Sequence, residues 1–246
     1  MATELVSIEI TSIYKKGNSF ANLPARMAKC TPDFKEAIFS IKSDVEAAGA
    51  PLRLSDLFRD FDMQNQAHLD YKSGKKKAYS PPPGSSFHEA GRAMDIDVAA
   101  LKPLGANYLE KFWQIAAKYK VVPIITEPNP GKSECWHFEC RGEFQTVRDL
   151  QGYTQAVRAA ILDVGVDLKD VTDDATAWIQ GQILSYGINI GPIDGVLGKN
   201  SKAAIRDIKK ARGWPKAALV PADDNSWESV DEWLIVFLDT LKVKAA

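Results

Sequence analysis

Residues 86–95 read Ser86-Phe87-His88-Glu89-Ala90-Gly91-Arg92-Ala93-Met94-Asp95, and a second short stretch reads Glu134-Cys135-Trp136-His137. Two of the three histidines of the chain lie in these stretches, each close to a carboxylate. Neutral imidazole nitrogen and carboxylate oxygen are ligands that zinc accepts, and a catalytic zinc keeps one coordination position open for water. We therefore predict that His88, Asp95 and His137 bind Zn²⁺. Glu134 remains as the predicted base for the attacking water.

The pattern of apolar and polar residues around the two stretches predicts the secondary structure on which these side chains lie. Apolar and polar residues alternate over 93–98, which indicates a half-buried strand that holds the carboxylate ligand, with His88 on the loop before it. Residues 136–140 indicate a second strand, on which His137 and Glu139 share one face. Glu134 has the wrong parity for a straight strand, so we expect it on a turn or bulge just before that strand.

Helical and strand patterns follow each other irregularly through the first 150 residues. Helices are predicted over 31–48 and 108–119, and strands over 52–58 and 121–126. This order indicates an α+β fold with a small, mainly antiparallel sheet flanked by helices. After about residue 150 only helical patterns occur; they cover residues 153–164, 173–186, 201–212 and 227–241. We predict a domain with the zinc site over residues 1–150 and a small all-helical domain over residues 151–246.

Composition limits the classes of function. The chain has 246 residues, 45% of them hydrophobic, and a net charge of −1, so it lacks the basic excess of a typical nucleic-acid-binding protein. Three cysteines cannot all pair, and the spacing of Cys135 and Cys140 is not that of a structural zinc site. The N-terminal residues lack the features of a signal peptide, and no apolar run is long enough to span a bilayer. We expect synthesis in the cytoplasm and no membrane insertion.

The pattern Ser-x-His-x-x-Gly-x-Ala-x-Asp followed by Glu-x-x-His resembles the LAS metallopeptidases (peptidase family M15). This group holds D-Ala-D-Ala carboxypeptidases and dipeptidases of the VanY and VanX type, and phage L-alanyl-D-glutamate endopeptidases. The residues in register with it are Ser86, His88, Gly91, Ala93, Asp95, Glu134 and His137. The resemblance implies that Glu134 passes the proton of the attacking water to the leaving amine, and that Ser86 helps to bind substrate.

A third segment agrees with the same resemblance. These enzymes commonly carry a Tyr-Arg-Ser-x-x-x-Gln segment, and residues 58–64 (Phe58-Arg59-Asp60-Phe61-Asp62-Met63-Gln64) stand in its place. The resemblance implies that Arg59 stabilises the tetrahedral intermediate or grips a substrate carboxylate, and that Gln64 contacts substrate. Asp60 replaces the usual Ser. The residues alone leave open a surface salt bridge between Arg59 and a neighbouring Asp.

Two further segments have alternative interpretations. Residues 70–86 form a basic loop rich in Pro, Gly and Ser; its lysines indicate a solvated face, with a rim or lid of the site as the alternative. Residues 187–205 resemble a peptidoglycan-binding module, with Ile179-Gln180 as its first helical pair and Asp194, Gly195, Gly198 and Ser201 as its turn. Ile208-Lys209 replaces the final Phe-Gln of that module. The alternative is a plain turn followed by a Ser-capped helix.

Taken together, these features predict a zinc metallopeptidase that hydrolyses peptide bonds in the peptidoglycan stem peptide. We expect an endolysin-like endopeptidase that cuts the L-Ala-D-Glu bond and reaches the cell wall or periplasm after release, as a phage lysin does. The alternatives are a D-Ala-D-Ala carboxypeptidase and a catalytically silent wall-binding or virion protein, and the intact Glu134 argues against the silent protein. The expected partner is peptidoglycan, bound by a monomer whose second domain raises the local substrate concentration.

Overall fold

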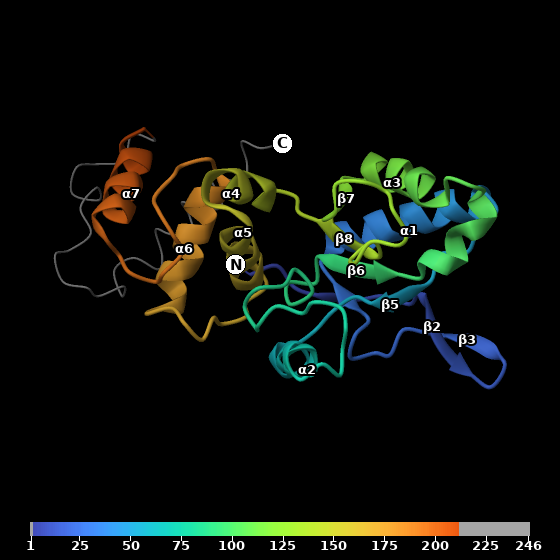
Figure 1. Ribbon diagram of the computed structural model, residues 1–246. Helices are drawn as coiled ribbons and strands as arrows, with labels where there is room; N and C mark the ends of the chain where they lie inside the picture. The colour runs from blue at the N-terminus through green and yellow to red at the C-terminus, as the bar shows by residue number, and fades with distance from the viewer. Residues whose placement is uncertain (1, 212–246) are drawn as a thin grey trace.

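A computed structural model of the protein describes residues 2–211, and its N-terminal part is built on a six-stranded sheet (Figure 1). The strand order is β3-β2-β5-β6-β8-β7, and only the β2–β5 pair is parallel. The strands are β2 (Thr11–Lys16), β3 (Ser19–Asn22), β5 (Leu54–Asp56), β6 (Ala93–Ile96), β7 (Val121–Pro123) and β8 (His137–Cys140). A separate two-stranded ribbon pairs β1 (Val6–Ser7) with β4 (Lys29–Cys30). The predicted α+β class with a small, mainly antiparallel sheet is confirmed.

Two helices, α1 (Pro32–Ala47) and α3 (Tyr108–Lys118), pack against one face of the sheet (Figure 1). Both lie where apolar residues recur at helical spacing. Thr31 is the N-cap of α1 and proline occupies the first turn, a position that needs no backbone donor. Phe112 of α3 meets Phe138 of β8 edge to face at 4.8 Å, and both rings are fully buried. The burial of each ring contributes about 1.5–3 kcal/mol to folding.

The strand that carries Asp95 is shorter and more buried than its alternating pattern predicts. β6 ends at Ile96, because the Asp97 side chain accepts backbone hydrogen bonds from Ala99 and Ala100 and so caps a 3₁₀ helix, η1 (Val98–Leu104). All four β6 residues are buried. On one face of β6, Ala93 packs in an apolar cluster with residues of the C-terminal helices, and Asp95 lines a pocket.

Besides η1, two α-helices of the described chain were not predicted. α2 (Phe61–Lys72) lies beneath the sheet in Figure 1 and begins at Asp60, whose side chain accepts the Met63 N–H. Asp and Ser are both good N-caps, so Asp60 can serve the same purpose as the Ser of the Tyr-Arg-Ser-x-x-x-Gln pattern. α4 (Phe144–Gln151) spans the predicted domain boundary.

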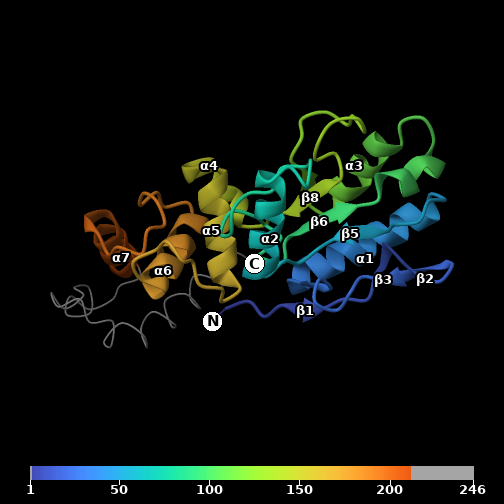
Figure 2. The ribbon, with the colours of Figure 1, turned by 60° about the horizontal axis from the view of Figure 1, so that its bottom comes forward.

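The chain then continues as α5 (Tyr153–Asp163), α6 (Asp174–Ser185) and α7 (Lys199–Ala211). These helices and α4 surround a second apolar cluster (Figure 2). Phe87, Ala90 and Ala93, from the loop and strand of the first motif, belong to the same cluster, so packing crosses residue 150. The boundary between two domains stays a prediction, and the helix expected over 227–241 lies outside the described residues.

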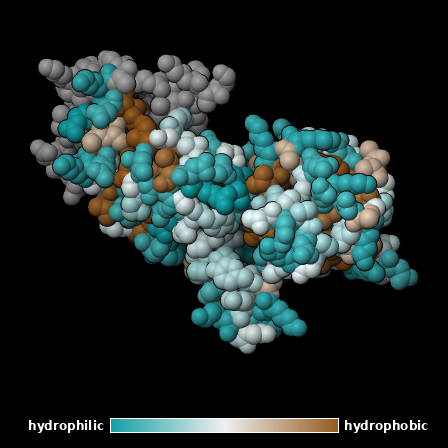
Figure 3. Space-filling view, turned by 45° about the horizontal axis from the view of Figure 1, so that its top comes forward, coloured by the Kyte–Doolittle hydropathy of each residue, from teal (hydrophilic) through white to brown (hydrophobic). Residues whose placement is uncertain are grey.

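The surface in Figure 3 is mostly hydrophilic, and its hydrophobic side chains gather mainly at the helical end. Among residues 2–211, no helix combines the length and apolar character that crossing a membrane requires.

Candidate metal and peptidase site

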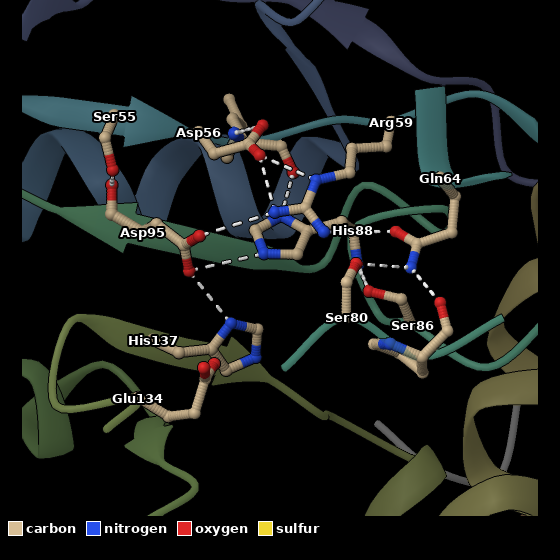
Figure 4. Close-up of polar contacts among 12 residues, drawn as sticks. Ser55, Asp56, Arg59, Gln64, Ser80, Ser86, His88, Asp95, Glu134 and His137 are labelled. Carbon is tan, nitrogen blue, oxygen red and sulfur yellow. Dashed lines mark hydrogen bonds and ion pairs between the residues drawn. The ribbon is translucent and has the colours of Figure 1, made fainter. Parts of the chain in front are cut away.

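The pairing of β6 with β8 brings the two motifs together. Asp95 lies directly opposite His137 in the antiparallel register, and Asp95 Oδ1 is 2.9 Å from His137 Nδ1 (Figure 4). His88 lies on the turn before β6, and its Nε2 is 3.3 Å from the same Asp95 oxygen. One ligand atom from each of the three residues lies within 4.8 Å of the other two. The structure therefore brings the three predicted ligands into one cluster.

The donor set fits a divalent metal ion. His88 Nδ1 lies 2.7 Å from the Leu57 carbonyl oxygen, so it carries the ring proton and leaves a lone pair on Nε2. Nε2 is buried and makes no hydrogen bond within residues 2–211, which is the arrangement a metal ligand needs. Burial by itself raises the pKa of Asp95. The contacts with His88 and His137 have the opposite and larger effect, so the pKa of Asp95 lies well below its usual range. An ionised carboxylate thus faces two imidazoles.

His137 is held through its other nitrogen. Nε2 lies 3.3 Å from Glu139 Oε1, and Glu139 is completely buried. Glu139 also accepts hydrogen bonds from Arg141 Nε and from the Tyr153 hydroxyl, both at 2.6 Å. Although burial raises the pKa of Glu139, the contacts with His137, Arg141 and Tyr153 bring it below its ordinary value. The parity of β8 already placed Glu139 beside His137, but nothing in the sequence indicated Tyr153.

Glu134 lies on the turn before β8, as its parity predicts. Its φ of +66° is in the left-handed region, and its carbonyl accepts the His137 N–H at 3.0 Å. Such a conformation is costly for a residue with a side chain and often occurs at functional sites. Burial and then the charge of Asp95 raise the pKa of Glu134, as suits a proton acceptor.

Arg59 reaches the site from the loop after β5 and is 7% exposed. Its guanidinium contacts Asp56 Oδ2 at 2.6 Å, Asp95 Oδ2 at 3.5 Å and Gln64 Oε1 at 3.1 Å (Figure 4). Gln64 is fully buried behind Arg59 and also donates to Ser80 and Pro81. The structure therefore brings Arg59 to the ligands but keeps Gln64 off the pocket wall.

The loop that precedes His88 is organised by two side chains. Ser86 Oγ accepts the His88 N–H at 3.3 Å and lines the pocket. Glu89, which sequence reasoning did not select, accepts backbone N–H groups from Gly84 and Ser86 at 2.9–3.2 Å. Its buried carboxylate holds the pocket wall in place, since each such bond ties the loop to the His88 turn.

A pocket of about 960 Å³ opens over the ligand cluster. His88, Asp95, Glu134 and His137 line its centre, and Arg148, Tyr153 and Thr154 of α4 and α5 line one end. Lys76, from the basic loop, also lines it, so the loop contributes to the rim. Burial and then Arg59 lower the pKa of Lys76, and its amino group has no hydrogen-bond or ion-pair partner in the described chain.

The residues of the second resemblance mainly bind one another. Gln180 is 2% exposed; its amide nitrogen donates to Asp194, Val196 and Ser201, and its oxygen accepts the backbone N–H groups of Asp194 and Gly195. Gly195 has a φ of +73°, and a Cβ there would lie 2.5 Å from the Asp173 nitrogen. This geometry is that of a tightly tied turn before α7.

The three cysteines are buried free thiols. Among residues 2–211, the group that could hold a metal ion consists of His88, Asp95 and His137.

The chain was compared with protein families, with curated proteins and with solved structures. Residues 27–142 match the family model described as VanY: D-alanyl-D-alanine carboxypeptidase. The LD-carboxypeptidase LdcB is 18% identical, over 56% of this chain and 67% of its own, with a TM-score of 0.43. Two structures of DacB from Streptococcus pneumoniae, one described as an L,D-carboxypeptidase, are 18% and 20% identical. They cover 52% and 55% of this chain and 84% of their own, with TM-scores of 0.35 and 0.36. No curated protein matches the chain significantly.

Proposed function

We propose that residues 27–142, which match the VanY family, form the core of a zinc-dependent peptidase that hydrolyses stem peptides of peptidoglycan. The observation that carries the proposal is the cluster of His88, Asp95 and His137, with Glu134 beside it on the wall of one pocket. A purely structural metal site needs no base, so the position of Glu134 favours an enzyme over a silent wall-binding or virion protein.

The chemistry follows from the groups that face the pocket. Zinc held by His88, Asp95 and His137 would polarise the scissile carbonyl and lower the pKa of water toward about 7. Glu134 accepts the proton of the attacking water and delivers it to the leaving amine. Its raised pKa assists the second of these steps, because a carboxyl group that is less acidic returns the proton more readily.

Negative charge that develops on the substrate needs a cation nearby. Arg59 was predicted for this role, and its guanidinium lines the pocket while it contacts Asp56, Gln64 and Asp95. Lys76 lines the same pocket without a partner among residues 2–211. We propose that Lys76 shares the role, with Arg59 holding Asp95 and Lys76 meeting the substrate. Ser86 lines the pocket and fixes the His88 backbone, and Gln64 supports Arg59 from behind.

Two peptide bonds of the stem peptide are candidates for the bond that the enzyme hydrolyses. The family match favours removal of a C-terminal D-residue, as in a D-Ala-D-Ala carboxypeptidase. The pocket of about 960 Å³ lies near the upper end of the usual range for small-ligand sites and has room for residues on both sides of the cut. That size supports the endopeptidase, with L-Ala-D-Glu as the expected bond. Release of the enzyme to the wall, as a phage lysin, and a monomeric state are further parts of the proposal.

The test compares wild type with Glu134→Ala on purified peptidoglycan, with released D-Ala and new amino termini identified by mass spectrometry. Glu127→Ala is the matched control, because Glu127 is an exposed carboxylate on the same loop that forms an ion pair with Lys132. We expect wild type and Glu127→Ala to release the same product and Glu134→Ala to release almost none. Equal activity in all three proteins would refute the mechanism, and no activity in any would favour the silent protein.

Metal content tests the ligands separately. We expect one zinc per chain in wild type and in Glu134→Ala, and its loss in His88→Ala and in His137→Ala. Full zinc content in both histidine variants would show that the ligands are wrong.

Peptidoglycan binding by the helical segment is a second proposal. A hollow of about 260 Å³ lies beside the turn that Gln180 holds, lined in part by Pro192, Lys199 and Asn200. These three side chains are exposed, so they can contact a ligand in the hollow. The Glu134→Ala protein, which we expect to be inactive, should therefore sediment with peptidoglycan. Adding Asn200→Ala to this variant should reduce the amount of protein that sediments. Equal sedimentation of both would contradict binding at the hollow.

A further inference from the structure

Tyr153 belongs to α5, beyond the residues that match the VanY family, yet it contacts one neighbour of each histidine of the metal cluster. Its hydroxyl donates to Glu139 Oε1 at 2.6 Å, and Glu139 contacts His137 Nε2. Its ring packs edge to face on Phe87, the residue before His88, with 5.7 Å between ring centroids. Helix α5 is therefore joined to the β8 ligand and to the turn that carries the other histidine.

The tautomer and the ring orientation of His137 depend on Glu139. His137 Nδ1 faces Asp95 and the ligand cluster, so a metal ion at the cluster would take the Nδ1 lone pair. The ring proton must then reside on Nε2 and be donated to Glu139. A carboxylate that receives this proton fixes the tautomer and the orientation of the ring.

Glu139 needs partners of its own to act in this way. Its side chain is completely buried, and a buried carboxylate is stable only when hydrogen bonds replace its lost hydration. Arg141 engages Oε2, and the Tyr153 hydroxyl engages Oε1, the same oxygen that faces His137. Because Tyr153 fixes the oxygen that receives the His137 proton, it controls the direction in which that oxygen points.

We propose that Tyr153 is a positioning residue of the metal site, which acts through Glu139 to hold His137 Nδ1 toward the metal. The helical segment is thus part of the peptidase unit. The inference rests on the proposed metal site, but it concerns zinc affinity and needs no knowledge of the bond that is cut.

The experiment measures zinc affinity by competition with a chelator of known affinity, at fixed pH, with the full-length protein. Tyr153→Phe removes only the hydroxyl and keeps the ring that packs on Phe87. We expect its zinc dissociation constant to rise about 10- to 100-fold. The matched control is Tyr119→Phe, which removes a tyrosine–carboxylate hydrogen bond of 3.1 Å to Asp44, between α3 and α1. Its dissociation constant should stay within about twofold of wild type.

A double-mutant cycle separates positioning from a general loss of packing. Glu139→Gln alone should weaken zinc binding, and adding Tyr153→Phe to it should cost less than Tyr153→Phe costs in wild type. An unchanged zinc affinity in Tyr153→Phe, or full additivity in the cycle, would overturn this inference while leaving the peptidase proposal intact. Absence of zinc binding by wild type would overturn both. Circular dichroism of each variant verifies that the zinc-free protein is folded.

Discussion

The left-handed φ of Glu134 produces a turn that places its side chain on the pocket wall. The turn from Glu134 to His137 closes through a backbone hydrogen bond of 3.0 Å, which leaves the carboxylate of Glu134 on the pocket wall. A straight strand would point this side chain away from the His137 face. The sequence predicted the departure from the strand by parity, and the strained φ is the structural means by which it occurs.

At the same scale, Lys76 allows a direct test of the cation proposed to meet the substrate. Lys76→Met keeps the length and the apolar stem of the side chain but removes the charge, so kcat/KM should fall on the order of 100-fold. Zinc content should not change, because Lys76 is not a ligand. Lys77→Met is the control, since Lys77 is an exposed neighbour that does not line the pocket. Equal kcat/KM in the two variants would assign the lysine run to a solvated face.

Among the elements, α1 is tied to the first motif by an ion pair. Asp33, in the first turn of α1, contacts the buried Arg92 guanidinium at 3.0 and 3.3 Å. Burial raises the pKa of Asp33, but Arg92 and hydrogen bonds lower it below its usual value. A carboxyl group with a lowered folded-state pKa stabilises the fold above its unfolded pKa, and this contribution is lost as the pH falls through the folded value.

We therefore predict that Asp33→Asn lowers the free energy of unfolding near pH 7 by up to about 1 kcal/mol. The magnitude is small because the Asp33 side chain is 53% exposed and water screens the pair. The difference from wild type should shrink as the pH falls below about 4, where wild-type Asp33 also becomes neutral. Urea unfolding of wild type and Asp33→Asn between pH 7 and pH values below about 4 measures this difference in the free energy of unfolding. Glu36→Gln is the control for loss of one charge on the same helix. A constant difference at every pH would contradict the ion pair.

The turn between α6 and α7 carries a second prediction at the scale of elements. Gly195→Ala would bring a Cβ within 2.5 Å of the Asp173 backbone and would also strain the positive φ. Gly191 has a φ of +93° with open space around it, so Gly191→Ala suffers only the strain. We expect Gly195→Ala to lower the free energy of unfolding by at least about 1 kcal/mol more than Gly191→Ala. Similar values for the two variants would show that the turn is not tightly packed.

For the whole molecule, the shared apolar cluster predicts what happens when the helical segment is removed. A chain that ends at residue 151 would expose Phe87, Phe144 and Val147 and would lose Tyr153. We expect it to bind a hydrophobic dye, to unfold without a cooperative transition and to bind zinc more weakly than wild type. A chain that ends at residue 211 keeps every described helix and serves as the control. Cooperative unfolding and full zinc affinity of the shorter chain would instead support an independent domain over residues 1–150.

Much of the fold and site could be predicted because the signals are local. Helices α1 and α3 repeat apolar residues at 3.6-residue spacing, and the ligand types, the strand parity and the position of Glu134 are read from a few consecutive residues. α2 gave no such signal, since its one fully buried residue is Gln64 rather than an apolar one. α4 has only eight residues and joins two regions that were treated as separate.

The amino-acid sequence by itself therefore predicted the donor set, the base and the class of fold, of which the class of fold is confirmed. Only the tertiary structure decided that Asp95 faces His137 across β6 and β8, that Gln64 lies behind Arg59, and that Tyr153 reaches Glu139. These contacts join residues up to 42 positions apart, as Asp95 and His137 are. Local propensity carries no information about such pairs, because the packing of apolar surface and the need to satisfy buried polar groups select them.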